Sequence, residues 1–284
     1  MTVPLESGET AGKPSEQPQL LAELARQHLA AGDRLGGIDL ARAALALDSD
    51  CFLAHQLLAE VALQGDNFRS IFAKIHQHFR PRTYLEIGVG RGTTISFVDP
   101  STLAIGVDPS PQIDAPLPPN VRILREPSDA FFARDGVRSE FAGAPLEFAF
   151  IDGMHLFEYA LRDFMHIERN GTPDTRVLVH DCYPLDDVTA SRTRTTTFWT
   201  GDVWKLTLCL RRYRPDLRVT TLAAPPSGLC VIRGLDPSST VLNERYSQIC
   251  AEMLPLSLSS LGADRRSALN LLTGDWQTAC ALLS

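Results

Sequence analysis

The sequence predicts an α/β fold in which a mostly parallel, doubly wound sheet is covered by helices on both faces. Short runs such as FAFI at 148–151 and VLV at 177–179 are apolar on consecutive positions, as expected of strands that are buried on both faces. Helical stretches separate these runs, and this alternation is typical of right-handed crossovers between parallel strands. We expect a helical cap before the sheet and a helical extension after it.

The chain divides into four segments in this prediction. Residues 1–18 are rich in Pro, Glu, Gly and Ser and are expected to form a disordered leader. Residues 19–68 form a helical region, residues 69–235 contain the sheet, and residues 236–284 form the helical extension. The apolar positions of that extension are Leu254, Leu256, Leu258, Leu261 and 269–272.

The helical region before the sheet contains an internal repeat. Gly32-Asp33 recurs as Gly65-Asp66, thirty-three residues later, with ALALDSD at 44–50 between them. This segment resembles the closing helix of a tetratricopeptide repeat, with small residues at Ala25 and Ala44 where helices cross. Such a repeat buries its apolar face only against a neighbour, so we expect these helices to lean on the following domain. A plain helical hairpin and a peptide-binding repeat both remain open.

Seven strands are expected in the central segment. The last two are joined by the turn AAPPSG at 223–228, which is short enough to permit only a hairpin, so one of them runs antiparallel. The expected strands are Tyr84–Ile87, Ala104–Val107, Val121–Leu124, Phe148–Ile151, Val177–Val179, Val219–Leu222 and Leu229–Ile232.

Composition and charge exclude several classes of function. The chain has 27 basic and 34 acidic residues, a net charge of −7, which argues against nucleic-acid binding. No apolar stretch approaches the roughly 20 residues of a membrane helix, and the N-terminus lacks the regions of a signal peptide. The six cysteines form no CxxC pair, so neither a zinc ribbon nor a disulfide framework is expected. We expect a cytoplasmic protein without nucleic-acid or membrane partners, and leave a homo-oligomer open.

A glycine-rich turn follows the first expected strand. The segment EIGVGRGTT at 86–94 has glycines at the alternate positions Gly88, Gly90 and Gly92. Such glycines let the backbone turn tightly and approach a ligand closely before a helix begins. Twenty residues after Gly88 the second strand ends at Asp108, where a carboxylate can hold ribose hydroxyls. A dinucleotide and an adenosyl cofactor both fit this arrangement.

The spacing of the glycines separates these two cofactors. A dinucleotide loop reads GxGxxG, and its third glycine would fall at position 93, which is Thr93 here. The string ExGxGxG, with Glu86 two residues before Gly88, resembles the first motif of class I S-adenosylmethionine-dependent methyltransferases. The resemblance implies a Rossmann-like, seven-stranded sheet, and it assigns Glu86, the three glycines and Asp108 to the cofactor.

Two further strings extend the resemblance over about residues 82–233. The fourth strand ends in IDGMH at 151–155, followed by Tyr159 and Asp163, and the fifth ends in VHDCY at 179–183. These strings look like those of metal-assisted small-molecule O-methyltransferases, including enzymes that act on sugar hydroxyls of natural products. The resemblance implies that Asp152 and Asp181 bind a divalent cation, Mg or Mn, and that His155 removes the acceptor's proton. Asp152 is also assigned to the cofactor site.

His180 departs from the pattern of that family, because many relatives have a second carboxylate at this position. Imidazole is a poor magnesium ligand and a better manganese or zinc ligand, so a set of Asp152, His180 and Asp181 favours manganese. A His180 that points elsewhere and a site without metal remain open. A helix cap is the alternative for Asp152, and a structural role is the alternative for His155.

Two other segments are candidates for ligand contacts. Ser128 and Asp129 follow the third strand, where relatives contact the adenine, and a helix N-cap is the alternative for either. Residues 191–218 carry seven basic and two acidic side chains, a net charge of +5, and arginines there can hold a phosphate or carboxylate. Those of 211–214 are expected on a solvated helix face. Trp199 and Trp204 fit stacking on an acceptor and core packing equally well.

These patterns together predict a methyltransferase. It would transfer a methyl group from S-adenosyl-L-methionine to an oxygen of a small molecule, with a sugar hydroxyl of a natural product favoured. A nicotinamide-dependent oxidoreductase is one alternative. The other is a non-catalytic helical-repeat interaction protein that keeps the sheet as a scaffold. The presence of Asp152, His155 and Asp181 at the strand ends disfavours the non-catalytic alternative, because a scaffold does not require these residues.

Overall fold

The computed structural model describes residues 16–284 as two compact units that divide between Leu58 and Ala59. Most of the expected leader, residues 1–15, lies outside the described residues. Gln17 and Pro18, the last two residues of the expected leader, are helical: they form the start of α1 (Gln17–Ala30). Proline is well tolerated in the first turn of a helix, because the backbone N–H groups of that turn have no acceptor within the helix.

The first unit contains α1, α2 (Arg34–Leu47) and the beginning of α3 (Phe52–Ala62). The turn between α1 and α2 uses Gly32 at a φ of +85°, and Asp33 caps α2 by accepting a 3.0 Å hydrogen bond from the Gly36 N–H. Small side chains fill the space where the helices pack, including the two alanines expected at helix crossings. That the helices form a tetratricopeptide-type repeat and cap the sheet stays a prediction. The fully buried alanines are Ala22, Ala25, Ala41, Ala44 and Ala54.

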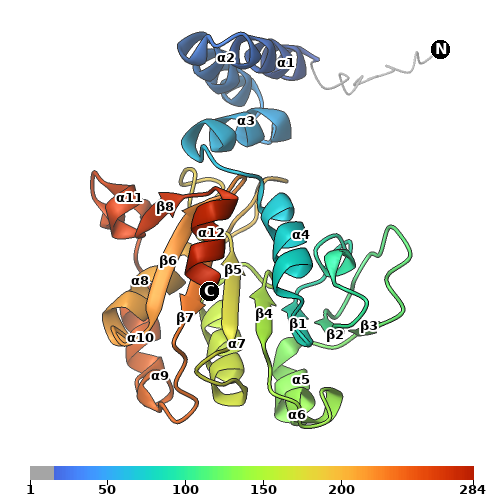
Figure 1. The fold of residues 1–284 in the computed structure, drawn as a ribbon. Helices are drawn as coiled ribbons and strands as arrows, with labels where there is room; N and C mark the ends of the chain where they lie inside the picture. Colours follow the sequence, from blue (N-terminus) through green and yellow to red (C-terminus); the bar gives the residue numbers. More distant parts are fainter. Residues whose placement is uncertain (1–15) are drawn as a thin grey trace, which may run out of the picture. The chain divides into compact units, whose positions relative to one another are not determined.

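The second unit is built around a sheet of eight strands in the order β3-β2-β1-β4-β5-β7-β6-β8 (Figure 1). Seven of them match the expected strands to within one residue at either end. The prediction of a seven-stranded sheet is wrong, because β8 adds an edge strand. The strands are β1 (Thr83–Ile87), β2 (Leu103–Val107), β3 (Val121–Leu124), β4 (Phe148–Ile151), β5 (Arg176–His180), β6 (Arg218–Ala223), β7 (Leu229–Arg233) and β8 (Leu271–Thr273).

Strand β8 lies in the segment that was expected to be wholly helical. It pairs in parallel with β6, with Leu271 opposite Thr221. The apolar run LNLL at 269–272 is too short for its periodicity to separate a strand from a helix. The open edge of β6 supplies the pairing that makes it a strand. The segment 236–284 is therefore a mixture of short helices and one edge strand.

The strand order brings the carboxyl ends of β1, β4 and β5 together. Strands β1 to β5 are mutually parallel, so these ends meet at one edge of the sheet. The order reverses between β1 and β4, and open α/β sheets bind their ligands in the crevice at such a point. Strand β7 runs antiparallel to both β5 and β6, which confirms the hairpin expected from the short turn at 223–228.

Helices cover both faces of this sheet (Figure 1). Successive strand residues point to opposite faces, so Leu85 and Ile87 lie in one buried cluster and Tyr84 lies in the other. Helices α5, α6, α7, α8, α9 and α10 contribute to the first cluster, and α4 and α12 contribute to the second. The helices of this unit are α4 (Phe68–Phe79), α5 (Ser128–Ala133), α6 (Gly136–Glu140), α7 (Phe157–Asn170), α8 (Trp204–Tyr213), α9 (Val241–Glu244), α10 (Tyr246–Met253), α11 (Arg265–Ala268) and α12 (Trp276–Leu283).

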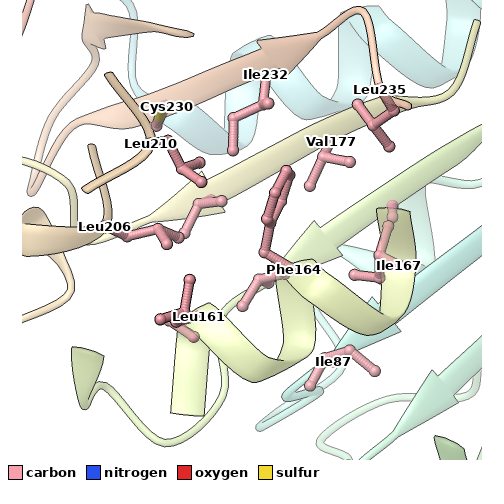
Figure 2. Close-up of a cluster of buried hydrophobic side chains, with 14 of the residues drawn as sticks. Ile87, Leu161, Phe164, Ile167, Val177, Leu206, Leu210, Cys230, Ile232 and Leu235 are labelled. Atoms are coloured by element: carbon pink, nitrogen blue, oxygen red, sulfur yellow. The ribbon is translucent and has the colours of Figure 1, made fainter. Parts of the chain in front are cut away.

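Helix α7 is anchored in the larger cluster (Figure 2). Its buried residues Leu161, Phe164 and Ile167 recur at helical spacing and share the cluster with Val177 of β5 and Ile232 of β7. Full burial of one such side chain stabilises the fold by about 2 kcal/mol. This anchoring places the start of α7 directly after the turn that follows β4.

The boundary of the sheet unit lies earlier in the chain than the expected residue 69. Leu63 packs against Ala223 and Leu271, and the Asp66 N–H donates a 2.9 Å hydrogen bond to the Gly274 carbonyl. Residues 59–68 therefore belong with the sheet. Across residues 16–284, no helix is both long enough and apolar enough to cross a membrane.

Candidate functional site

A cavity of about 590 Å³ opens at the carboxyl ends of β1, β2 and β4. Its walls come from three loops and from helices α4, α5 and α7, which are far apart in the sequence and meet at the carboxyl ends of the parallel strands. The walls are the glycine loop at 88–94, residues 107–109 after β2, residues 127–129 at the start of α5, residues 152–155 after β4, Tyr159 and Asp163 of α7, and Phe68 and Arg69 of α4.

Two glycines of the loop have distinct structural requirements. A Cβ atom on Gly88, which has a φ of +83°, would lie 2.1 Å from the Asp152 carbonyl oxygen, so only glycine lets the β1 and β4 loops approach this closely. Gly90 has a φ of +52°, and a Cβ atom there would meet nothing within 4 Å. Since Gly90 lines the cavity, the open space beside it is space for a ligand.

Asp108 holds the glycine loop in place from the end of β2. Its Oδ2 accepts hydrogen bonds of 2.9 Å from the backbone N–H groups of Val89 and Gly90, and its Oδ1 accepts one of 2.7 Å from Ser110. A carboxylate has about four lone-pair sites, so three bonds leave capacity for one more donor. Asp108 lines the cavity and is positioned to accept a hydrogen bond from a ligand hydroxyl.

Glu86 lies behind the loop and outside the cavity wall. It is fully buried, and it accepts hydrogen bonds from the Tyr84 hydroxyl at 2.5 Å and the Thr94 hydroxyl at 2.7 Å. Burial raises the pKa of Glu86 to about 8, although both hydrogen bonds act in the opposite direction. Instead of the direct cofactor contact expected from the sequence, Glu86 ties the end of the loop at Thr94 to strand β1.

Ser128 and Asp129 line the cavity where an adenine contact was expected. Neither is the N-cap of α5, since that position is Pro127. Asp129 accepts hydrogen bonds of 3.1 and 2.8 Å from the Arg162 guanidinium. Burial raises the pKa of the neighbouring Asp163 to about 7, against the lowering effect of a hydrogen bond from Ser128.

Four polar side chains meet where β4 and β5 end. Ligand atoms of Asp152, His155 and Asp181 all lie within 4.8 Å of one another. His155 Nδ1 is 2.8 Å from Asp181 Oδ2, and His155 Nε2 is 3.5 Å from Asp152 Oδ1. His180 directs Nδ1 toward the same carboxylates at 3.3 Å, while its Nε2 lies 3.1 Å from the Ser227 hydroxyl. The geometry thus brings His155 into the three-residue group in which His180 was expected.

This group has the donor set of a cation site. Asp152 Oδ1 and Asp181 Oδ2 are buried, and the nearest donors to them among residues 16–284 are imidazole nitrogens of His155 and His180 at 2.8–3.5 Å. His155 Nδ1 is close to Asp181 Oδ2 but is also 3.2 Å from the Trp199 carbonyl, which accepts its hydrogen when that nitrogen is protonated. Two buried carboxylates are costly unless positive charge lies beside them, and either the imidazoles or a bound cation can supply that charge. Carboxylates with an imidazole suit manganese or zinc better than magnesium.

The charge state of His155 follows from its neighbours. Burial by itself would lower the pKa of His155, but Asp181 and, less strongly, Asp152 raise it to about 9. The two imidazoles in turn hold the pKa of Asp181 below its ordinary value, against the effect of burial. Without a metal, His155 is therefore an imidazolium at neutral pH and cannot accept a proton from an acceptor.

Residues 199–202 hold His155 in place, and the sequence did not indicate this role for them. His155 has a φ of +55°, an uncommon conformation for a residue other than glycine. The Trp199 ring lies parallel to the imidazole at 5.3 Å, and the Asp202 N–H donates a 3.2 Å bond to the His155 carbonyl. Asp202 also accepts a 2.8 Å bond from the Phe157 N–H at the start of α7. Asp202 is almost fully buried. This burial depends on the tertiary structure, and no local sequence pattern indicates it.

The basic segment after β5 is mostly structural. Arg192 pairs with Glu158 at 2.6 Å and with Asp202 at 2.7 Å, so its charge is balanced within the protein. Trp204 is only 1% exposed and belongs to the core. The solvated helix face expected for residues 211–214 is wrong for Arg214, which is 2% exposed and pairs with Glu168 at 2.6 Å.

No protein-family model matches the chain. No curated protein matches it either. Several solved structures are similar in fold. The O-methyltransferase of tomaymycin synthesis from Streptomyces achromogenes, in complex with SAM, is 15% identical, with a TM-score of 0.42 over 80% of this chain and 93% of that chain.

Two further structures give comparable values. The O-methyltransferase of Bacillus cereus in complex with SAH is 13% identical, with a TM-score of 0.40 over 63% of this chain and 87% of that chain. An SAH-bound methyltransferase of Podospora anserina is 16% identical, with a TM-score of 0.41 over 60% and 78%. These identities and TM-scores are low, so the similarities assign neither a ligand nor a reaction to this chain.

Proposed function

We propose that this protein transfers a methyl group from S-adenosylmethionine to a hydroxyl oxygen of a small molecule, with a sugar hydroxyl favoured. The observation that carries the proposal is one continuous cavity between two kinds of wall. One wall is the glycine loop, open at Gly90 and held by Asp108. The other is the polar group of Asp152 and His155, at the edge where the order of the strands reverses.

Each wall has a chemical part in this proposal. The bound cofactor supplies an electrophilic methyl group. The open backbone at Gly90 and the remaining lone pair of Asp108 hold its adenosine part. The group at the ends of β4 and β5 orients the acceptor oxygen, so that donor and acceptor meet at near-attack distance, which is the main source of rate in such a displacement.

Activation of the acceptor hydroxyl requires a positive charge or a base. We propose that Asp152, His155 and Asp181 hold a divalent cation, with manganese favoured over magnesium by the imidazole. Such a cation would lower the pKa of a hydroxyl beside it, so that its proton could pass to water while the oxygen forms a bond to the methyl carbon and the bond from that carbon to sulfur breaks. The alternative, His155 as base without metal, needs a neutral imidazole, whereas the two carboxylates raise its pKa to about 9.

Binding of the cofactor tests the assignment directly. Calorimetry should show that the wild-type protein binds S-adenosylmethionine and its demethylated product, and that Asp108→Ala weakens both at least about tenfold, because a charge-assisted hydrogen bond is lost and the loop loses its anchor. Asp174→Ala, which removes an exposed carboxylate outside the cavity, is the matched control. Binding of a nicotinamide dinucleotide in place of S-adenosylmethionine would instead support an oxidoreductase.

A further inference from the structure

We propose that the acceptor carries an anionic group, a carboxylate or a phosphate, which pairs with Arg69. This inference rests on the proposed methyl transfer and concerns only the class of acceptor. Arg69 is the second residue of α4, before the first strand, and it lines the same cavity as His155. It takes the role that the sequence had suggested for arginines after β5.

Arg69 differs from the other charged groups on the cavity wall. Arg91 pairs with Asp114 at 2.6 Å, and Asp129 pairs with Arg162 at 2.8 Å. Among residues 16–284, no carboxylate lies within ion-pair distance of the Arg69 guanidinium. Each of the other charged groups on the wall lies beside a polar partner in the protein: Asp108, Asp152, His155 and Asp163.

Arg69 lies at the same end of the cavity as the proposed cation site. Its guanidinium carbon is 5.4 Å from the centroid of the Phe68 ring, and that ring packs on His180 with centroids 4.1 Å apart. His180 Nδ1 faces the carboxylates of Asp152 and Asp181 at 3.3 Å. The wall formed by Phe68 and Arg69 is therefore close to the place proposed for the acceptor hydroxyl.

The local electrostatics favour an anion at that wall. A guanidinium binds carboxylate or phosphate oxygens in a bidentate manner. The N-terminus of α4 adds positive partial charge of the same sign. Asn67 caps this helix by accepting a 3.0 Å hydrogen bond from the backbone N–H of Arg69. Arg69 is exposed at the cavity wall, where an anionic acceptor would give its guanidinium an ionic partner.

Binding without turnover tests the proposal. Calorimetry would use the protein saturated with S-adenosylhomocysteine and manganese, and D-glucuronate, glucose 6-phosphate and D-glucose as probes that share a ring and differ in charge. We expect at least one anion to bind about tenfold more tightly than glucose, which corresponds to one charge-assisted hydrogen bond. Arg69→Gln should abolish that preference, and Arg69→Lys should retain part of it. The two anions distinguish a carboxylate from a phosphate.

The control variant is Lys74→Gln on the same helix. Lys74 is outside the cavity and pairs with Asp66 at 2.9 Å, so its loss should leave the preference for the anion unchanged. Equal affinity for glucose and both anions, no binding of either anion, or a preference that survives in Arg69→Gln would overturn the proposal. Binding of S-adenosylhomocysteine to the wild-type protein is measured first. If the wild-type protein does not bind it, the proposed function is overturned instead.

Discussion

Among single residues, Gly90 is set apart by the empty space beside it. A Cβ atom on Gly88 would collide with backbone, and one on Gly92 would press on Ile113 at 3.1 Å, but one on Gly90 would meet nothing within 4 Å. The protein therefore has no need of glycine at this position for its own packing. The left-handed backbone and the access of a ligand are the two remaining reasons.

Gly90→Val separates these two reasons. The valine should abolish S-adenosylhomocysteine binding, because its side chain occupies the space of the ligand, and should cost about 1–2 kcal/mol of stability for a β-branched residue at positive φ. Gly143→Val is the matched control, since Gly143 also has positive φ and open space but lies outside the cavity. Calorimetry and urea unfolding would measure both. Unchanged affinity in Gly90→Val would show that Gly90 is only a turn residue.

The carboxylates Asp152 and Asp181 give a second prediction at the residue scale. Each of Asp152→Asn and Asp181→Asn removes one negative charge from the group around His155, so manganese affinity should fall at least about tenfold. His155→Ala should also weaken it. Intrinsic tryptophan fluorescence can report binding, since the Trp199 ring is parallel to His155 at 5.3 Å, and Asp174→Asn is the control.

Two outcomes would change this assignment. A wild-type protein that binds no manganese, or Asp152 and Asp181 variants that bind it normally, would remove the metal from the mechanism. A larger loss in His180→Ala than in His155→Ala would restore the ligand set expected from the sequence.

At the scale of elements, α4 contains a buried group that makes the fold sensitive to acid. His76 is 0% exposed, packs against Tyr84 and Phe148, and has no hydrogen-bond partner among residues 16–284 for either ring nitrogen. Burial lowers the pKa of His76 from 6.5 to about 4. Between these values the unfolded chain binds a proton that the folded chain does not bind, so stability falls as the pH falls.

This linkage predicts the behaviour of His76→Phe. The wild-type protein should lose about 3 kcal/mol more stability than the variant between pH 6.5 and pH 4, since one pKa unit is about 1.4 kcal/mol. His78→Phe, on the exposed side of the same helix, should keep the wild-type dependence. Urea unfolding across this range makes the comparison. Parallel curves for the wild type and His76→Phe would show that His76 accepts a proton in the folded state.

At the scale of the whole sheet unit, helix α12 covers part of one face of the sheet. Leu283 of α12 is fully buried in the cluster that α4 also covers, and its carbonyl accepts hydrogen bonds from Arg176 at 2.5 Å and Arg233 at 2.6 Å. Leu283→Ala should cost about 2–5 kcal/mol of unfolding free energy. Leu282 is only half-buried, so Leu282→Ala should lower the unfolding free energy clearly less. Equal losses of unfolding free energy in the two variants, measured by urea unfolding, would contradict this role of α12.

Much of this fold could be predicted because its strands are short, apolar and separated by helical segments. The same local patterns located Gly88, Gly90, Asp108, Asp152 and Asp181 at strand ends. Parallel strands place their carboxyl ends at one edge, so these residues were expected to meet without knowledge of the tertiary structure. Seven strand positions and the strand-end part of the cavity wall follow from information within a few residues of each site.

The sequence by itself determined the local states and the strand-end positions of the site. Only the tertiary structure decided the burial of Glu86, the pairing of β8 with the edge of β6, the contact of Trp199 with His155, and the place of Arg69 on the cavity wall. These features share a physical reason. Whether a side chain faces solvent, a ligand or another charge depends on segments that are tens of residues away in the sequence. A local sequence pattern does not indicate which distant segment will pack against it.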